Sequence, residues 1–532
     1  MHNVLPAGYE SIFYNVFMPS TTKENLIECF NPATGEKIAQ IKASGENEVK
    51  EKAKRAKDAF FFWSTLNIDK RIQYLSKIYN LIIEGRDNIA KTITKNNGKP
   101  LAESYLTEIA STLQVMEHFI KNGKELLDKK NIRLGPLYPT KKSYISYEPI
   151  GTVAMIEPWN YPFYLPFSVI TKTLLCGNTF LFKPSSTVSV IGKLIEDILI
   201  ASGLPEGVSN VVYGNSDLAK CLIEADIDKV VFTGSTSVGK EIASTCAKRL
   251  IPLSLELGGK DPAIVLKSTN IDYAARGILW GAVSNCGQAC ASIERVYVES
   301  GIYKEFVEKI THFTNLLKVG DGMSEDTDVG PLINNEQLLK VEEHINDAIN
   351  KGAKVHTGGK RITGPGFFFE PTVLSNVNHS MKIMTEETFG PVIPLMKFDG
   401  TEEVIKYAND TKYGLSASIW AGDTKATKEM AERLNCGTVW INDSLFLQAH
   451  PACPWTGYKE SGYGSLSIYD FLKTKHISTD QGFIPGLRPK SYWWFPYKGK
   501  AKSYSDLIEV LFKFGLKEKA KAAFETMINF LK

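Results

Sequence analysis

Two thiols stand four residues apart in the stretch Asn285-Cys286-Gly287-Gln288-Ala289-Cys290. The stretch lies between a helix-like run at 271–283 and a β-rich run at 295–298. A cysteine at such a junction could lie near backbone N–H groups, which lower the pKa of a thiol and favour the nucleophilic thiolate. The alternative is that both cysteines are small buried side chains without a chemical role. Residues elsewhere in the chain decide between these interpretations.

Polar and glycine-containing motifs follow five predicted strands. The strands are expected at 153–156, 179–182, 208–213, 230–232 and 253–257, with helices at 188–202, 217–225 and 238–248 between them. Such alternation predicts a parallel sheet covered on both faces, which binds ligands at the carboxyl ends of its strands. The motifs at those ends are Pro158-Trp159-Asn160, Lys183-Pro184-Ser185, Gly214, Gly234-Ser235 and Glu256-Leu257-Gly258. We therefore expect them to converge at one edge of the sheet.

The motif Gly234-Ser235-Thr236-Ser237-Val238-Gly239 is a candidate phosphate site. It ends a strand and opens a helix, where free N–H groups and the helix dipole favour an anion. No G-x-G-x-x-G fingerprint follows a strand, and turn glycines are common, so this motif is weak evidence by itself.

The remaining pattern predicts a larger α/β protein. Helices at 46–62, 68–84, 86–94 and 101–127 should cover the sheet. A second α/β block is expected at about 259–453, with strands at 296–298, 391–398, 417–420 and 437–441. We interpret Leu257-Gly258-Gly259 as the hinge between the two blocks.

Composition excludes several classes of protein. The net charge of +3 over 532 residues does not indicate a nucleic-acid partner. The cysteines are scattered, without disulfide spacing or a C-x-x-C metal pair, which fits a reducing compartment such as the cytoplasm and predicts no metal site. The N-terminus lacks the basic and apolar regions of a secretory signal, and no apolar run reaches the ~18 residues of a membrane span.

The motifs, taken in order, resemble those of the aldehyde dehydrogenase superfamily, from about Asn31 to about His476. Each motif is weak alone, but their shared order and spacing is specific. Besides the cysteine stretch they are Pro158-Trp159-Asn160-Tyr161-Pro162, Lys183-Pro184-Ser185, Phe232-Thr233-Gly234-Ser235, Leu255-Glu256-Leu257-Gly258-Gly259-Lys260, Glu386-Glu387-Thr388-Phe389-Gly390-Pro391 and Ser461-Gly462-Tyr463-Gly464.

The resemblance implies oxidation of an aldehyde to its carboxylate through a thiohemiacetal and a thioester on Cys290, with Cys286 non-catalytic. Asn160 and the Cys290 backbone N–H would stabilise the oxyanion. Glu256, poorly solvated between Leu255 and Leu257, would activate the hydrolytic water, since burial raises the pKa of a carboxyl group. The alternatives are a coenzyme A-acylating dehydrogenase, which Glu256 argues against, and a catalytically silent structural protein on the same fold.

The implied cofactor is NAD or NADP. Many NAD-preferring relatives carry a Glu three residues after the lysine that matches Lys183, but this chain has Ser186, which would tolerate or favour a 2′-phosphate. The alternative is that Ser186 only begins the following helix. The expected cofactor residues are Ile156, Pro158, Trp159, Lys183, Ser185, Ser186, Gly214, Phe232, Gly234, Ser235, Val238, Leu257, Glu387 and Phe389.

An apolar tunnel for the substrate is expected beside the nucleophile. Tyr161, Tyr164 and Leu165 should line it, and Ser284 stands where many relatives have an aromatic residue. No arginine is clearly placed to bind a second carboxylate. The sequence therefore predicts a neutral aliphatic or aromatic aldehyde as substrate.

These observations predict a doubly wound, Rossmann-like cofactor domain at 1–131 and 148–257 and a catalytic α/β domain at 258–455. Segments 132–147 and 473–486 should form a small arm that assembles homodimers or homotetramers. The tail at 487–532 joins aromatic residues, lysines and two amphipathic stripes, the first at 504–512 and the second at 520–531. It suits either a peripheral membrane contact or packing on the protein itself.

Overall fold

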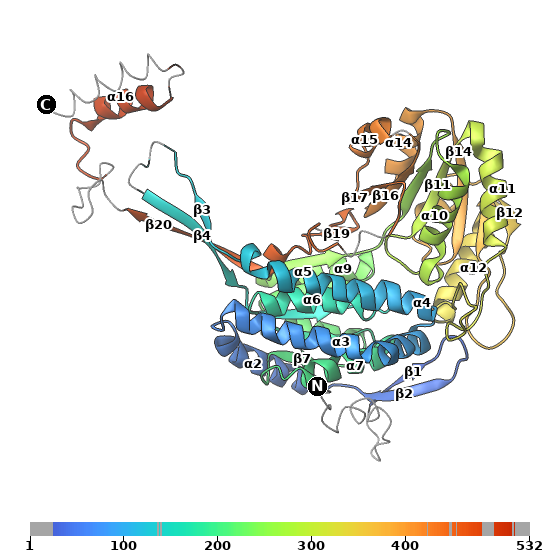
Figure 1. Cartoon of the computed structure of the whole chain (residues 1–532), viewed down its shortest axis with the longest axis horizontal. Coiled ribbons are helices and arrows are strands. Elements are labelled where there is room, and N and C mark those ends of the chain that lie inside the picture. The colour runs from blue at the N-terminus through green and yellow to red at the C-terminus, as the bar shows by residue number, and fades with distance from the viewer. Residues whose placement is uncertain are drawn as a thin grey trace, which may run out of the picture. The chain divides into compact units, whose positions relative to one another are not determined.

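The computed structural model describes residues 25–135, 138, 141–422, 424–445, 450–453, 455–480, 494–512 and 515. The chain divides into two compact units, Met1–Lys124 with Pro149–Leu472, and Glu125–Glu148 with Lys473–Lys532. The first unit contains two α/β sheets built mainly from parallel strands (Figure 1), which confirms the predicted fold class.

The first sheet has the order β19-β9-β8-β5-β6-β7, and only β19 is antiparallel to its neighbour. Strands β5 to β9 match the five strands expected from the sequence. The strands are β5 (Thr152–Ile156), β6 (Thr179–Lys183), β7 (Ser209–Val211), β8 (Lys229–Thr233), β9 (Leu253–Glu256) and β19 (Gly462–Tyr463).

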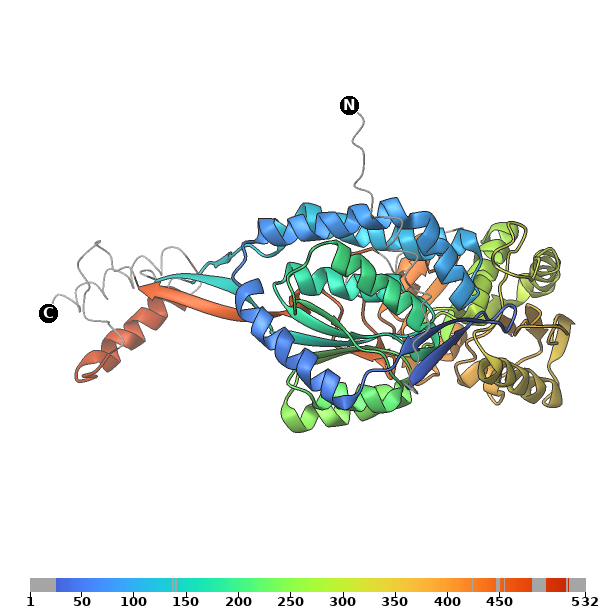
Figure 2. The ribbon, with the colours of Figure 1, turned by 90° about the horizontal axis from the view of Figure 1, so that it is seen from below.

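Helices lie on both faces of this sheet (Figure 2). On one face α2 (Glu46–Trp63), α8 (Ser216–Glu224) and α9 (Thr236–Arg249) share an apolar cluster with the strands. Helices α6 (Tyr164–Leu175) and α7 (Ser189–Ala201) also contact the sheet. Helix α3 (Ile68–Asn97) packs on α6 and α7. Burial on both faces explains the continuous apolar runs of the strands.

The prediction of two helices at 68–84 and 86–94 is wrong, because α3 is a single helix through Gly85. A glycine inside a helix costs only about 1 kcal/mol relative to alanine. The stripe of Ile78, Ile82, Ile89 and Ile93 is fully buried on both sides of the glycine. Burial of this stripe outweighs the glycine cost.

The region expected as a plain helix at 101–127 contains a π-helix instead of a continuous α-helix. Helix α4 (Leu101–Glu103) leads into the π segment η2 (Ser104–Ala110), and α5 (Ser111–Leu126) follows. A π turn shifts the hydrogen-bond register to i→i+5 and changes which side chains share a face.

The second sheet has the order β12-β13-β14-β11-β10-β16-β17, and only the β12–β13 pair is antiparallel. Strand β10 follows the predicted hinge and was not expected from the sequence. Helices α10 and α11 lie beside β11 and β14 (Figure 1). The strands are β10 (Asp261–Val265), β11 (Ile293–Glu299), β12 (Lys354–Thr357), β13 (Thr372–Ser375), β14 (Val392–Phe398), β16 (Ser416–Trp420) and β17 (Thr438–Ile441).

Other elements of the first unit complete these layers. The helices around the second sheet are α10 (Ile271–Val283), α11 (Tyr303–Thr314), α12 (Asn335–Asn350), α13 (Lys382–Thr385), α14 (Thr401–Asn409) and α15 (Thr424–Ala431). The 3₁₀ turns are η3 (Ser186–Val188), η4 (Ser284–Gly287), η5 (Ser300–Ile302) and η7 (Ile468–Phe471). The short strand pairs are β1 (Leu26–Phe30) with β2 (Lys37–Lys42), and β15 (Tyr413–Gly414) with β18 (Tyr458–Lys459).

The second unit holds a three-stranded sheet of β20 (Leu472–Asp480), β4 (Lys141–Pro149) and β3 (Lys130–Ile132), in that order. Its helix α16 (Lys500–Phe512) contains the first predicted amphipathic stripe, and the second stripe lies outside the described residues. Among the helices that the structure describes, none combines the length and apolar character needed to cross a membrane.

Candidate active site

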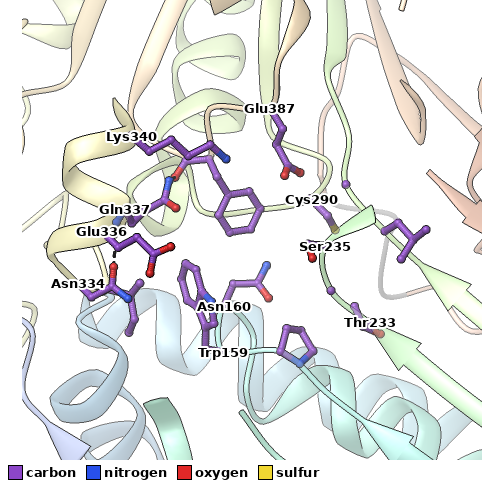
Figure 3. Close-up of a pocket in the computed structure, with 16 residues that line it drawn as sticks. Trp159, Asn160, Thr233, Ser235, Cys290, Asn334, Glu336, Gln337, Lys340 and Glu387 are labelled. Atoms are coloured by element: carbon purple, nitrogen blue, oxygen red, sulfur yellow. Dashed lines mark hydrogen bonds between the residues drawn. The ribbon is translucent and has the colours of Figure 1, made fainter. Parts of the chain in front are cut away.

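A cavity of about 320 Å³ lies between the carboxyl ends of the first sheet and the second sheet (Figure 3). It brings together Asn160, Cys290 and Glu387, which are far apart in the sequence. The rings of Trp159 and Phe389 meet edge to face in its wall, with centroids 5.5 Å apart. The lining also includes Pro158, Thr233, Gly234, Ser235, Leu257, Gly258, Ile333, Asn334, Glu336, Gln337 and Lys340.

The loop that presents Cys290 is strained and closely packed. Asn285 (φ 52°) and Cys286 (φ 56°) both adopt the left-handed conformation, which is costly for residues other than glycine. Cys286 is 2% exposed within the core of the second sheet, whereas Cys290 lines the cavity. Of these two thiols, the Cys290 thiol can be reached from the cavity and the Cys286 thiol cannot.

Close backbone approaches also fix this loop. A Cβ atom on Gly259 would lie 2.2 Å from the Cys290 carbonyl oxygen. Gly287 has a φ of 71°, and a Cβ atom there would lie 2.2 Å from the Gly390 carbonyl oxygen. Both contacts are with backbone atoms that cannot rotate away, so these positions require glycine.

Hydrogen bonds join Asn160 to the same loop. Its side-chain Nδ2 donates to the Gln288 carbonyl over 3.1 Å, and Asn285 Nδ2 donates to the Asn160 carbonyl over 2.9 Å. The ammonium of Lys99 donates to the Asn160 carbonyl over 2.8 Å and pairs with Glu108 over 2.6 Å. The amide of Asn160 is therefore held in a rigid network, as a preorganised oxyanion donor requires.

A backbone N–H group lies near the Cys290 thiol as expected, but other effects on the pKa of this thiol outweigh it. Burial raises the pKa of Cys290, and the carboxylates of Asp261, Glu256 and Glu387 raise it further. A hydrogen bond from the Ala291 backbone acts in the opposite direction but is weaker. The thiol needs either added positive charge or a proton acceptor before it can react.

Glu256 ends β9 and is 4% exposed. Burial raises its pKa well above the ordinary range, and the buried ammonium of Lys172 acts in the opposite direction. A hydrogen bond from the Trp455 side chain also lowers this pKa, but its effect is smaller than that of burial.

A second cavity of about 580 Å³ continues along the edge of the first sheet. Most of the expected cofactor residues line one or both cavities, but Gly214 lines neither and packs against the Leu218 side chain instead. The expected residues that line the second cavity are Ile156, Pro158, Trp159, Lys183, Ser185, Ser186, Phe232, Gly234, Ser235 and Val238. Leu257, Glu387 and Phe389 line the first.

Unsatisfied polar groups in these cavities fit a dinucleotide. Burial lowers the pKa of Lys183 to about 8, and among the described residues its ammonium hydrogen-bonds the Pro184 carbonyl alone, over 3.3 Å. Helix α9 begins at Thr236 without a side-chain cap, so its first N–H groups face the cavity edge as a ready anion site. Glu387 Oε1 accepts from the Gly259 N–H over 3.1 Å, which leaves its other oxygen for a ribose hydroxyl.

A third cavity of about 290 Å³ contains three of the four residues expected in the substrate tunnel, Tyr161, Tyr164 and Ser284. Leu165 is not among its lining residues, because on α6 it follows Tyr164 and lies about 100° further around the helix axis. The other lining residues are Leu106, Thr107, Ala110, Ser111, Gln114, Trp280 and Leu445.

Comparison with known proteins decides the family. The model of the Aldehyde dehydrogenase family matches residues 17–477. The chain belongs to the aldehyde dehydrogenase family. This aldehyde dehydrogenase oxidises an aldehyde to its carboxylic acid with NAD or NADP.

Relatives of this aldehyde dehydrogenase are similar over nearly their whole length. A probable succinate-semialdehyde dehydrogenase (NADP(+)) of Sinorhizobium fredii is 35% identical over 84% of this chain and 91% of its own. A betaine aldehyde dehydrogenase of Bacillus subtilis is 34% identical over 91% of this chain and 99% of its own. The NAD+ complex structure of an aldehyde dehydrogenase from Bacillus cereus superposes with a TM-score of 0.83, at 31% identity, covering 90% and 99% of the two chains.

Several charged residues with partners inside the protein were not singled out from the sequence. Lys99 donates to the Asn160 carbonyl and pairs with Glu108, and Glu103 accepts from the Asn285 N–H. Glu294 accepts from the Thr388 and Phe389 N–H groups and pairs with Lys260 over 2.5 Å. Charged residues in helices and loops normally indicate solvent exposure. Only the fold shows that these groups are paired inside the protein.

Proposed function

We propose that this enzyme oxidises a neutral, mainly apolar aldehyde. The observation that carries the proposal is the lining of the 290 Å³ cavity. Its described residues include five large apolar or aromatic side chains, among them Tyr161 and Trp280, but neither lysine nor arginine. A substrate carboxylate buried there would lack a charged partner, which is costly. The relatives are named for substrates that range from an anionic semialdehyde to a betaine aldehyde, so family membership alone does not select one substrate.

A panel of aldehydes tests this proposal. We expect hexanal and benzaldehyde to give kcat/KM values at least ~10-fold above that of succinate semialdehyde, since an unpaired buried charge costs more than 1.4 kcal/mol. Each substrate is run with NAD and with NADP, and formation of the reduced cofactor is followed by absorbance. Preference for the semialdehyde would overturn the proposed substrate class and leave the family assignment intact.

The same proposal assigns a role to each residue around the nucleophile. Cys290 Sγ bonds to the aldehyde carbon, and the Asn160 amide and the Cys290 N–H donate to the oxygen that becomes negative. The same carbon then gives up a hydride, for which NAD(P)+, when bound, would supply the acceptor, and the oxygen keeps no proton, so that a thioester on Cys290 remains. Glu256 then takes a proton from a water that attacks the Cys290 thioester, and the carboxylic acid leaves as the thiol is restored.

We also propose that NADP is used at least as well as NAD. Ser186 lines the 580 Å³ cavity beside Lys183, and a hydroxyl there can donate to a 2′-phosphate that a carboxylate would repel. Lys183 adds a nearby cation for the same group. The aldehyde panel measures this preference, because each substrate is run with NAD and with NADP.

The second unit supports two further proposals, homo-oligomer assembly through the arm and a peripheral membrane contact through the tail. In the described sheet β20 is an edge strand, and edge strands can pair with another chain. Around α16 the side chains of Trp494, Phe495, Ile508 and Phe512 are exposed beside lysines, as at a membrane surface. The free cysteines support a cytoplasmic location for the remainder of the protein.

Deletion of the residues after Gly486 separates these proposals. We expect the truncated enzyme to keep its dimer or tetramer mass in light scattering and its activity on short aldehydes, but to lose cosedimentation with anionic phosphatidylserine liposomes at low salt. Fractionation of cells that produce both forms checks the location. Full-length protein that stays in the supernatant would show that the tail only packs on protein.

A further inference from the structure

Two carboxylates reach the active site from one π-helical turn. Glu103 ends α4, and Glu108 lies five residues later within η2. In an α-helix, side chains five residues apart lie about 140° apart around the axis. The i→i+5 register of a π-helix brings them to the same side, and such turns are frequent at functional sites.

Glu108 supports the Asn160 half of the site. Its side chain is fully buried, and one oxygen pairs with Lys99, which donates to the Asn160 carbonyl. The other oxygen accepts from the Phe163 N–H over 3.1 Å and from the Tyr164 N–H over 2.8 Å. This carboxylate therefore fixes the Asn160 carbonyl, through Lys99, and the backbone three and four residues after the proposed oxyanion donor.

Glu103 supports the loop that leads to Cys290. Its Oε2 accepts from the Asn285 N–H over 2.9 Å, and its Oε1 accepts from the Ser284 hydroxyl over 3.0 Å. Asn285 is one of the two left-handed residues that lead to Cys290. A carboxylate acceptor at this N–H holds the loop in a conformation that its own backbone disfavours.

We propose that Glu103 is a positioning residue that keeps the Cys290 loop aligned with Asn160, so that both oxyanion donors meet the same oxygen. Ser284 also lines the proposed substrate cavity. Glu103 therefore holds both a residue of the substrate wall and the loop that carries Cys290. The inference rests on the roles proposed above for Cys290 and Asn160.

The test compares two reactions of the same thiol in full-length enzyme. Single-turnover formation of NAD(P)H from an aldehyde that the wild type oxidises requires oxyanion stabilisation, whereas alkylation of Cys290 by iodoacetamide does not. The variants are Glu103→Ala and Glu103→Gln, and Glu117→Gln is the matched control, an exposed carboxylate on α5 that pairs only with Lys121. Peptide mass spectrometry assigns the alkylation to Cys290.

We expect Glu103→Ala to slow NAD(P)H formation ~100-fold and alkylation no more than ~3-fold, because misplacement by about 1 Å affects the oriented reaction most. Glu103→Gln should recover at least ~10-fold of this loss, since its amide oxygen still accepts from the Asn285 N–H. The cofactor Kd and the Glu117→Gln rates should remain unchanged.

Wild-type NAD(P)H formation in Glu103→Ala would overturn the proposal. Equal losses in both reactions, together with a lower melting temperature, would also overturn it, because they indicate a packing role only. If the alanine variant does not fold, Glu103→Leu takes its place, because leucine fills similar space but cannot accept from the Asn285 N–H, and a wild-type rate in that variant has the same consequence. Failure of the wild type to reduce the cofactor with any aldehyde would instead contradict the proposed function.

Discussion

Cys290→Ala is expected to abolish aldehyde oxidation, with kcat reduced by about 10⁴-fold or more, because the covalent step has no other nucleophile. Among the described residues that line the 320 Å³ cavity, Cys290 is the only thiol. Binding of NAD(P)+ should be nearly unchanged, since Cys290 is one small side chain among the many residues that line the two cofactor cavities. Steady-state absorbance and a fluorescence titration measure the two effects.

Cys286→Ala is the matched control, because it removes a neighbouring thiol from the apolar core rather than from the cavity. We expect its activity to stay close to that of the wild type, with a small loss of stability. An inactive Cys286→Ala and an active Cys290→Ala would show that the nucleophile has been assigned to the wrong cysteine.

Glu256→Gln is expected to give a rapid burst of about one NAD(P)H per active site, followed by turnover slower by about 10²–10⁴-fold. The amide can still fill the buried position at the end of β9, but it cannot take a proton from water. Acylation therefore proceeds and hydrolysis becomes limiting. Stopped-flow absorbance gives the burst, and mass spectrometry of the quenched enzyme detects the thioester on Cys290.

The pH dependence of the wild type provides an internal check on Glu256. Burial raises the pKa of this carboxyl group, and only its ionised form accepts a proton, so hydrolysis is lost as the pH falls through the raised pKa. The midpoint should lie above the ordinary range of a glutamate, and Glu256→Gln should lack this limb. Release of the thioester by coenzyme A but not by water would favour the acylating alternative.

The sheet and the convergence of its motifs were predictable because both arise from local patterns. Alternating strands and helices predict parallel pairing, and the polar motifs after β5, β6 and β8 then meet at one edge. Strand β10 was missed because it starts with Asp261 and Pro262, which are depleted in strands. Gly85 predicted a break that tertiary packing prevents.

The supporting charges could not be predicted in the same way. The spacing of Glu103 and Glu108 places them on different faces of an α-helix, and only the π turn of η2 brings both to the site. The raised pKa of Cys290 depends on carboxylates from Asp261, Glu256 and Glu387, which are far away in the chain. Electrostatic environment is a property of the folded site and has no local sequence signal.

The loop that carries Cys290 and the wall of the 290 Å³ cavity should differ in how well they tolerate mutation. Gly259 and Gly287 each lie against a backbone carbonyl oxygen of the site. A larger residue at either position would displace the Cys290 loop, so we expect substitutions there to reduce activity. The wall formed by Leu106, Gln114 and Trp280 belongs to the 290 Å³ cavity, whose lining includes neither of these glycines. New substrates can therefore evolve on this chain, or be selected in a library, while the chemistry is inherited unchanged.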